Sequence, residues 1–483
     1  MVKTRIAPSP TGYPHVGTAY IGIFNYVWAR KNNGRFVVRI EDTDRKRYVE
    51  GAEEGILRAL KWLGLDYDEG PDVGGPNGPY RQSERLELYR RYAQKLLDKG
   101  LAYRAFETPE ELAAIREELQ KKGLGYGYDG RARNIPRAEA EARAAAGEPH
   151  VIRLKTPESG SVVVYDELRG AIEFSSHEIP DVVLLKSDGY PTYHLAVVVD
   201  DHLMEVTDVI RGEDWLVSTP IQKLLYQAFV WDEPKWYHLP LLRAPGGAKL
   251  SKRTGHTSID YYREEGFLPE ALVNYLSTMG FSMPDEREIF SLEEMIAAFN
   301  WERVSLGGPV FDEEKLRWMN GKYIREVLSL EEVCDRLKPF LQSAGLEWGT
   351  DEYLCQVVTV MRPRFETLKE FVEKARYFFD EDYPFAPKAE KELRKGAETL
   401  RELKELLAGL PDFAPERTEE AITAFAAARD LKLRKVMQPL RAAITGSLAT
   451  PGMYELLEIL GKERVMKRLE RAFAHLRELE GDQ

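Results

Sequence analysis

The loop that decides the fold reads Pro8-Ser9-Pro10-Thr11-Gly12-Tyr13-Pro14-His15-Val16-Gly17. Residues 4–7 before it are predicted to form a strand, and residues 16–31 after it carry apolar side chains at helical spacing. Asn32-Asn33-Gly34 ends this helix, and residues 37–41 alternate as a second strand. A strand, a loop, a helix and a second strand in this order begin a doubly wound α/β sheet.

The same loop has the composition of a nucleotide-binding turn. Its three prolines and two glycines stiffen and tighten the chain, and Gly17 leaves room for a planar ligand against the backbone. The start of the following helix offers N–H groups and partial positive charge to an anion, and His15 can donate to phosphate oxygens. Taken alone, the segment fits a proline-rich surface loop with an incidental histidine equally well.

A second segment of interest is basic and follows Pro245-Gly246-Gly247. It reads Lys249-Leu250-Ser251-Lys252-Arg253. Ammonium groups on a glycine-containing loop are suited to stabilising the charge of a pyrophosphate leaving group. Taken alone, so short a run of charge is more typical of a solvated loop.

The bulk composition limits the class of protein. The chain has 483 residues, too many for one ordinary core, and its 68 basic and 80 acidic residues give a net charge of −12. This charge lowers the expectation of a nucleic-acid partner, although RNA binding depends on local basic patches. No segment resembles a membrane span or an export signal, and two cysteines cannot form a metal cage. These features predict a cytoplasmic protein.

Together, the two loop segments change the interpretation. Their order and spacing around one sheet resemble the paired HIGH and KMSKS signatures of class I aminoacyl-tRNA synthetases. The resemblance narrows to bacterial, discriminating glutamyl-tRNA synthetases within the glutamyl/glutaminyl branch. The further matches are Ile6-Ala7-Pro8-Ser9-Pro10-Thr11-Gly12, Arg39-Ile40-Glu41-Asp42-Thr43-Asp44, Asp188-Gly189-Tyr190-Pro191-Thr192-Tyr193, Val209-Ile210-Arg211-Gly212-Glu213-Asp214 and Ser305-Leu306-Gly307-Gly308.

The resemblance implies a glutamate site. Arginine is suited to a bidentate clamp on an acidic side chain, and this role falls on Arg5. Arg211, Ser9, Ala7 and Tyr193 would complete the pocket, and Glu41 would hold the substrate ammonium. Each of these residues also has an ordinary reading, such as a surface arginine or a strand-end carboxylate. Some relatives carry an asparagine where this chain has His194 and Val197, both of which we expect near the end of a strand that begins at Tyr193.

The resemblance also implies an ATP site and a two-step ligation. ATP is a substrate that brings Mg²⁺ with it. The expected ATP-binding residues are His15, Gly17, Thr18, Trp215, Leu242, Leu250 and Lys252, and the catalytic ones are His15, Gly17, Lys249 and Lys252. Some relatives hold a zinc ion in an inserted domain. Here the comparable stretches Tyr103-Arg104-Ala105-Phe106 and Tyr126-Gly127-Tyr128-Asp129 carry no cysteine or histidine, which predicts no structural zinc.

The second substrate implied by the resemblance is tRNA-Glu. Arg364 in Met361-Arg362-Pro363-Arg364-Phe365 would read the third anticodon base, since an arginine can bond and stack on a splayed base. The other expected tRNA contacts are Arg47, Trp318, Arg441, Thr450 and Pro451. Basic residues around Lys432 also fit a solvated helix face.

The predicted fold is a Rossmann-type parallel sheet with an inserted α+β domain, followed by an all-α C-terminal half. The expected domains are 1–85 and 193–244 for the catalytic sheet, 86–192 for the insertion that binds the acceptor end, 245–328 for a stem-contact domain, and 329–386 and 387–483 for two helical anticodon-binding domains. The predicted activity is ligation of L-glutamate to tRNA-Glu through a glutamyl-adenylate, by a monomer that does not bind a membrane.

Four alternatives remain open at this stage. A non-discriminating enzyme would also charge tRNA-Gln. A glutaminyl enzyme typically ends in β-barrels, and a queuosine-modifying relative lacks the helical half. A non-catalytic RNA-binding paralogue would have lost residues such as His15 and Lys249, which this chain retains.

Overall fold

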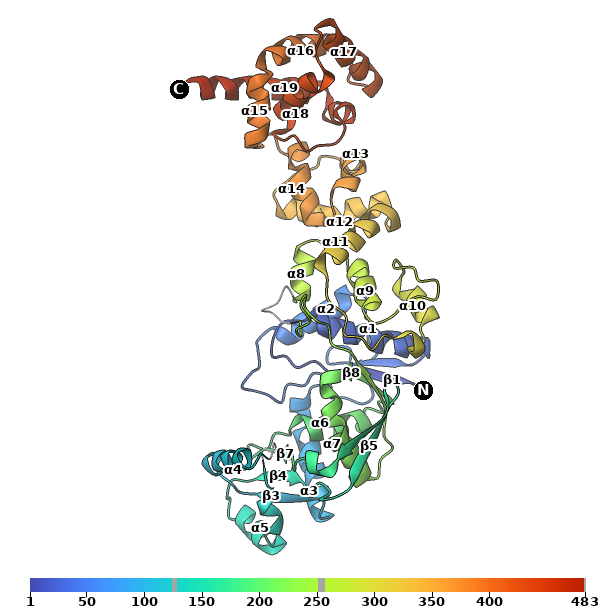
Figure 1. The fold of residues 1–483 in the computed structure, drawn as a ribbon, viewed down its shortest axis with the longest axis vertical. Coiled ribbons are helices and arrows are strands. Elements are labelled where there is room, and N and C mark those ends of the chain that lie inside the picture. Colours follow the sequence, from blue (N-terminus) through green and yellow to red (C-terminus); the bar gives the residue numbers. More distant parts are fainter. Residues whose placement is uncertain (124–127, 251–256, 482–483) are drawn as a thin grey trace. The chain divides into compact units, whose positions relative to one another are not determined.

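A computed structural model describes residues 1–123, 128–250 and 257–481 (Figure 1). The chain folds into two compact units. The first comprises residues 1–261 and 269–313, and the second comprises residues 262–268 and 314–483. The chain therefore passes between the units three times. The finer division into six segments stays a prediction.

The first unit is built on a mostly parallel sheet. Its strands are β1 (Lys3–Ile6), β2 (Arg35–Val38), β5 (Ser161–Asp166), β6 (Gly170–Ser175), β8 (Asp208–Gly212) and β9 (Lys235–Leu239). β1 pairs with β2, β8 with β9 and β5 with β9, all in parallel, and β6 closes one edge antiparallel to β5. β1 lies beside β8, where Thr207 N–H donates to the Lys3 carbonyl (3.0 Å). The predicted doubly wound sheet is confirmed.

Helices cover this sheet on both faces. The helices are α1 (Val16–Lys31), α2 (Ala52–Trp62), α3 (Leu86–Asp98), α6 (Tyr193–Leu203) and α7 (Thr219–Phe229), with 3₁₀ turns η1 (Gln82–Arg85) and η4 (Glu213–Ser218). Figure 1 places α1 on one side of β1 and β8, and α6 with α7 on the other. Val16, Ile23, Phe24 and Val27 of α1 are fully buried, which explains why this segment forms the helix predicted from its apolar spacing.

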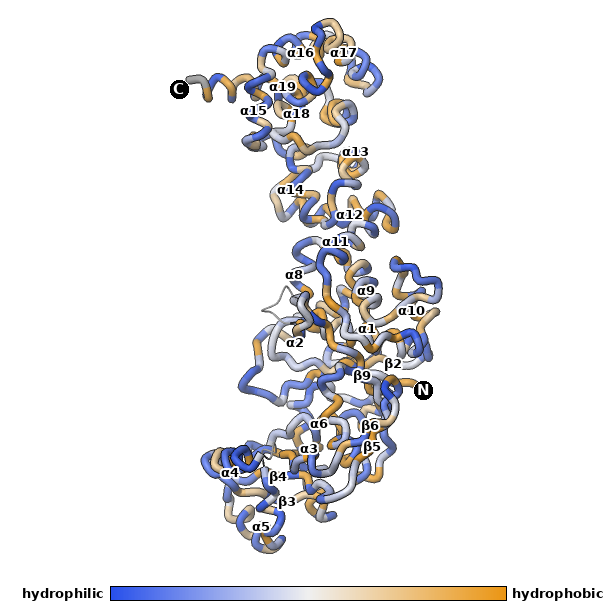
Figure 2. Tube along the Cα trace, in the orientation of Figure 1, coloured by the Kyte–Doolittle hydropathy of each residue, from blue (hydrophilic) through white to orange (hydrophobic). Residues whose placement is uncertain are grey.

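A smaller sheet forms the insertion. Its strands are β3 (Ala102–Ala105), β4 (Val151–Leu154) and β7 (Val183–Leu185), antiparallel in the order β3-β4-β7. The accompanying helices are α4 (Pro109–Lys121), η2 (Arg131–Asn134), α5 (Arg137–Ala145) and η3 (Ser176–Glu178). α4 is mostly hydrophilic in Figure 2, and its buried residues are Ile115 and Leu119. Asp181 links β3 to η2, because its carboxylate accepts hydrogen bonds from the Tyr103 hydroxyl (2.5 Å) and from the Arg133 guanidinium.

One predicted element is wrong. The run Leu195-Ala196-Val197-Val198-Val199 was expected to be a strand following Tyr193, but it lies inside helix α6. β-Branched residues favour strands only weakly. This run is buried on all sides between α3, α7 and the sheet, and a fully apolar helix can be buried there as well as a strand. Tyr193 therefore begins a helix, and His194 and Val197 lie within it.

The first unit is completed by elements that follow the second loop. They are α8 (Ile259–Glu264), α9 (Pro269–Thr278), α10 (Leu292–Ala298) and η5 (Trp301–Arg303), and the residues of α8 after Tyr261 count with the second unit. α9 and α10 pack on α1, and Trp301 stacks on Tyr237 of β9 with ring centroids 4.4 Å apart.

The second unit is all-helical, as predicted. Its elements are α11 (Glu313–Lys322), the π-helical turn η6 (Tyr323–Val327), α12 (Leu330–Ser343), α13 (Asp351–Met361), η7 (Arg362–Arg364), α14 (Leu368–Phe379), α15 (Pro387–Lys395), α16 (Ala397–Gly409), α17 (Pro415–Ala428), α18 (Leu433–Thr445) and α19 (Met453–Gly481). Ser329 caps α12 with a reciprocal bond to Glu332, and Pro387 occupies the first turn of α15. α19 is interrupted at Gly461, where φ is 74°.

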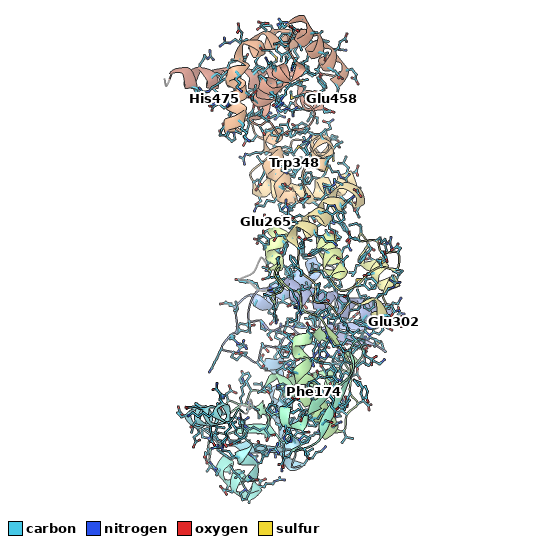
Figure 3. The ribbon with its side chains drawn as sticks, in the orientation of Figure 1. Phe174, Glu265, Glu302, Trp348, Glu458 and His475 are labelled. Atoms are coloured by element: carbon cyan, nitrogen blue, oxygen red, sulfur yellow. The ribbon has the colours of Figure 1, made fainter. Side chains whose placement is uncertain are left out.

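Two breaks divide the helices of this unit. One lies at Pro363, between α13 and α14, and the other at Gly396, between α15 and α16. Between α14 and α15 the Tyr383 side chain is buried, and its hydroxyl donates to the Ala443 carbonyl (2.9 Å). In the same region His475, labelled in Figure 3, lies 3.3 Å from Glu390 and connects α19 to α15.

Glu381 is the centre of an ion cluster that joins α14 to α19. It accepts hydrogen bonds from Arg464 (2.6 Å) and from Arg468 (2.9 Å), and the Arg468 side chain is only 1% exposed. Although partial burial raises it, the bonds and charges of these two arginines lower the pKa of Glu381 from its usual value of 4.5 to about 2. The ionised carboxylate therefore stabilises the fold above pH 4.5, and this stabilisation is lost as the pH falls toward 2.

We expect Glu381→Gln to destabilise the helical unit by about 1–2 kcal/mol at pH 7, after allowance for the partial exposure of the carboxylate. Chemical unfolding followed by far-UV circular dichroism measures this difference. The difference between wild type and variant should shrink as the pH is lowered from 4.5 to 2. A difference that stays constant over this range would contradict the assignment, and Glu392→Gln, at an exposed pair with Lys395, is the control.

Candidate active site

The histidine loop pairs through its backbone with residues 257–259, which follow the second segment in the chain. Val16 N–H donates to the Thr257 carbonyl (2.8 Å) and Ile259 N–H donates to the Pro14 carbonyl (3.0 Å), so that His15 and Ser258 form an antiparallel bridge. Lys249 lies just ahead of this return, in a bridge with Arg243. Lys249 and Leu250 line the same cavity as His15 and Gly17, so the described part of the basic segment lies near the histidine loop. Ser251, Lys252 and Arg253 lie outside the described residues.

His15 caps the first helix. Its Nδ1 accepts the Gly17 N–H (2.9 Å), which places the proton of the neutral ring on Nε2. A side chain at position 17 would crowd this ring, since its Cβ would lie 3.1 Å from Nδ1. Gly17 thus leaves room for the capping ring, and the N–H of the neutral ring lies at the other nitrogen.

Lys249 is the basic residue of the second loop that falls within the described residues. Its ammonium lies 2.9 Å from the Asp214 carboxylate, and its side chain is 63% exposed. Exposed ion pairs of this kind contribute about 0.2–1 kcal/mol. Asp214 therefore keeps the Lys249 ammonium close to the cavity, and breaking this ion pair costs little free energy. A polyphosphate carries more negative charge than Asp214 and can replace it as the partner of Lys249.

A cavity of about 910 Å³ opens between these segments. All the residues of the described chain that were expected to be catalytic or to bind glutamate or ATP line it. They are Arg5, Ala7, Ser9, His15, Gly17, Thr18, Glu41, Tyr193, Arg211, Trp215, Leu242, Lys249 and Leu250, and Arg47 lies at the same cavity. Leu242 and Leu250 are buried and bonded backbone to backbone (3.0 Å), while Trp215 is 41% exposed and packs on Tyr193 with centroids 4.3 Å apart.

Arg211 is a buried cation held only by neutral groups. Its Nη1 donates to the Tyr193 hydroxyl (3.0 Å) and to Gln222 (2.9 Å), and its Nη2 donates to the Thr219 hydroxyl (2.8 Å). Burial lowers the pKa of this guanidinium, which has no carboxylate within 4 Å among the described residues. A buried charge without a counter-ion is costly unless a ligand supplies one. The arrangement is that of a pocket for an anion.

Arg5 faces the same pocket but is paired. Its Nε and Nη2 donate to Asp201, and Asp201 also accepts from Arg39 (2.6 Å), whose other end donates to Glu41 (3.0 Å). These four residues form a buried ladder of alternating charge, which we call the charge ladder. Burial raises the pKa of the Glu41 carboxyl against the opposing effect of the arginines, so an arriving ammonium would favour its ionised form. One end of the ladder thus suits an anion and the other a cation.

Comparison with known families agrees with this geometry. Residues 1–318 match the family described as "tRNA synthetases class I (E and Q), catalytic domain", and residues 332–473 match the family described as "Anticodon binding domain". The chain belongs to the class I tRNA synthetases of the E and Q group. Confirmation of the family rests on a match that covers well over half of the chain.

Individual relatives of this synthetase are similar along their whole length. A glutamate–tRNA ligase of Thermus thermophilus is 68% identical over 98% of the chain and all of the relative. One from Deinococcus radiodurans is 52% identical over 97% of the chain and 98% of the relative. A crystal structure of a glutamate tRNA ligase from Elizabethkingia meningosepticum, in complex with its amino acid, matches with a TM-score of 0.88 and 38% identity, over 98% of the chain and 99% of that structure.

Sequence reasoning missed three groups that shape the site of this synthetase. Asp201 and Arg39 form the middle of the charge ladder, and His238 bonds Arg211 from the neighbouring strand. The one available signal for Asp201 was its place beside Asp200 at the end of an otherwise apolar run, since paired acids are rare there unless they are bound. For His238 no local pattern existed.

Two expected tRNA-binding residues, Arg364 and Arg441, lie in the helical unit of the synthetase. Burial lowers the pKa of Arg441, and the positive charge of Arg364 lowers it further. Arg441 donates to the Pro451 carbonyl (2.8 Å) and to the Thr450 side chain, while Arg364 is exposed. Among the described residues neither guanidinium has a carboxylate within 4 Å, in a unit where many arginines are paired.

The other two expected tRNA contacts are less informative. Arg47 donates to Asp44 (2.6 Å) and is largely exposed, and Trp318 of α11 is 38% exposed.

Within the described parts of the chain, no three His, Cys, Asp or Glu side chains are grouped to hold a metal ion. The absence of a structural zinc stays a prediction, and residues 124–127 of the relevant stretch lie outside the described residues. None of the described helices is both long and apolar enough to cross a membrane.

Proposed function

We propose that this synthetase ligates L-glutamate to tRNA-Glu with ATP, through a glutamyl-adenylate. The observation that carries the proposal is Arg211, a buried guanidinium for which the described residues supply no counter-ion, in the cavity that His15 and Lys249 also line. A side-chain carboxylate would supply that counter-ion, with Arg5 as a second donor. A glutamine side chain offers no charge to either arginine. The relatives named as glutamate–tRNA ligases support the same substrate.

In this proposal the cavity orients both substrates for in-line attack. Arg211 and Arg5 hold the side-chain carboxylate, Glu41 holds the ammonium, and the remaining pocket residues Ala7, Ser9 and Tyr193 close around the chain of the amino acid. The α-carboxylate then attacks the α-phosphorus of ATP, and the bond to pyrophosphate breaks. A ribose hydroxyl of the tRNA end afterwards attacks the activated carbonyl and releases AMP. No protein nucleophile is required, since positioning and charge stabilisation supply the catalysis.

The ATP part of the site follows from the two loops. His15 would donate from Nε2 to a phosphate oxygen, and Gly17 and Thr18 would offer the helix start. Lys249 would leave Asp214 for the leaving pyrophosphate, and Lys252 is proposed to bind the pyrophosphate as well. The adenine would lie near Trp215, Leu242 and Leu250. Mg²⁺ would enter with the nucleotide. We also propose a monomer that works in the cytoplasm.

ATP–pyrophosphate exchange, run with and without tRNA, tests the proposal. Exchange should require glutamate and should not proceed with glutamine or aspartate in its place. Absence of exchange in the presence of glutamate and cognate tRNA would refute it. Aminoacylation of purified tRNA-Glu and tRNA-Gln then separates the discriminating enzyme from the non-discriminating alternative.

Arg364 is proposed to read the third anticodon base, with Arg441, Thr450 and Pro451 as neighbouring contacts and with Arg47 and Trp318 as contacts elsewhere on the tRNA. Arg364→Gln should therefore relax discrimination and lower the ratio of kcat/KM for tRNA-Glu over kcat/KM for tRNA-Gln by about tenfold, which is about 1.4 kcal/mol. Charging of both tRNAs by the variant measures this ratio. Arg417→Gln, at an exposed pair with Asp412, is the matched control. An unchanged ratio would refute the assigned role.

A further inference from the structure

His238 is a buried histidine that touches the anion pocket from behind. It lies on β9 directly opposite Arg211 of β8 in the strand register, and its side chain is inaccessible to solvent. Its Nε2 lies 3.0 Å from Arg211 Nε, and its Nδ1 lies 2.6 Å from Asp166 Oδ2 at the end of β5. Three neighbouring strands of the sheet therefore contribute one residue each to a row of polar groups.

Each group in this row has one possible role. A guanidinium donates and cannot accept, so Nε2 of His238 must be the acceptor of the Arg211 Nε–H. The proton of the ring is then on Nδ1, from which it is donated to Asp166. Asp166 is itself fixed, because its Oδ1 accepts the backbone N–H groups of Leu168 and Arg169 (2.9 Å each). The direction of every hydrogen bond in the row is thus determined.

The consequence is a guanidinium that is fixed without being neutralised. A carboxylate in the place of His238 would hold Arg211 equally well but would occupy its charge, as Asp201 does for Arg5. Burial and the charge of Arg211 favour the neutral ring, while Asp166 favours the protonated one, and the net effect lowers the pKa of His238. The neutral imidazole leaves the charge of Arg211 to a ligand.

We propose that His238, oriented by Asp166, is a positioning residue for the substrate carboxylate, one that sets the direction of the Arg211 guanidinium. This inference rests on the proposed role of Arg211 in glutamate binding. His238 would then take part in substrate selection although it does not line the cavity. This role requires the His238 tautomer that Asp166 maintains, with the proton on Nδ1.

Asp166→Asn tests the tautomer at unchanged side-chain size. The two backbone N–H groups keep the amide oxygen at the Oδ1 position, so the amide NH₂ faces Nδ1 of His238. Nδ1 must then accept, and the ring proton moves to Nε2, where it opposes the Arg211 Nε–H. We expect the KM for glutamate in aminoacylation of tRNA to rise about 10- to 30-fold, with the KM for ATP changed less than twofold.

A pair of substitutions at His238 separates its two ends. The amide of Asn reaches the Nδ1 position and can still donate to Asp166, but it offers no acceptor to Arg211. The amide of Gln reaches the Nε2 position and offers its oxygen there. His238→Asn should raise the KM for glutamate as Asp166→Asn does, and His238→Gln should keep it within about threefold of wild type.

The outcomes are distinguishable from a merely structural role. His177→Asn, at an exposed histidine of the same unit, is the matched control, and thermal unfolding of every variant records the fold. Equal KM values for glutamate in His238→Asn and His238→Gln, or a parallel rise in the KM for ATP, would overturn the proposal. If Arg211→Gln also leaves the KM for glutamate unchanged, the proposed role of Arg211 fails first. Should His238→Asn not fold, Asp166→Asn compared with His238→Gln decides.

Discussion

Arg211→Gln is expected to lower kcat/KM for glutamate by about 10³-fold, which corresponds to about 4 kcal/mol. The guanidinium is the one charge in the cavity that is buried and carries no counter-ion among the described residues. Its removal would leave the substrate carboxylate in a low-dielectric pocket with Arg5 already bound to Asp201. The loss should fall on the KM for glutamate, and the KM for ATP should change little.

The same substitution should not weaken the fold. A buried charge held by neutral groups is itself costly, and its replacement by a neutral amide removes that cost. We expect a melting temperature equal to or above that of the wild type, measured by calorimetry. Arg131→Gln, at an exposed pair with Asp129, controls for the loss of one positive charge. An active variant with an unchanged KM would show that the substrate carboxylate binds elsewhere.

Asp201→Asn is expected to have the opposite effect on stability. This carboxylate holds Arg5 and Arg39 together, and although burial raises its pKa, the two guanidiniums lower it. An amide would leave two buried cations facing each other. Removing one partner of a buried ion pair lowers the free energy of unfolding by about 3–5 kcal/mol. A loss of this size lowers the melting temperature of the unit by about 10 °C.

Activity should fall with it, because the charge ladder sets the distance between Arg5 and Glu41. We expect glutamate-dependent exchange to drop at least 100-fold at a temperature where the variant is still folded. Asp98→Asn, which removes an exposed partner of Arg137, is the control. A melting temperature within about 2 °C of wild type would contradict the view that the ladder is an obligatory part of the fold.

The parts of the site that could be predicted are those with a local pattern. The strand, proline-rich loop and helix around His15 are contiguous, so composition and spacing were sufficient to predict these elements. An anion at the helix start was favoured only when the loop was considered together with the second segment. The pairing of His15 with Ser258 was not predicted, because no local pattern at Ser258 indicates it.

The parts that could not be predicted depend on contacts between distant residues. Arg5 meets Asp201 across 196 positions and His238 meets Asp166 across 72, and such pairs leave no periodicity. The run ending at Val199 was misread for a related reason. Its burial on all sides removes the amphipathic signal by which a helix is distinguished from a strand.

The seven residues Tyr262–Leu268 belong to the helical unit although the chain on both sides of them belongs to the other. Within their unit, the Gly266 carbonyl accepts the Leu368 N–H (3.0 Å) and Asn320 accepts the Leu268 N–H (2.8 Å). A single proteolytic cut after Glu313 would therefore not separate the protein into two free modules, because the amino-terminal fragment keeps this heptapeptide. An exchange of the anticodon-binding half between relatives would therefore have to include the heptapeptide.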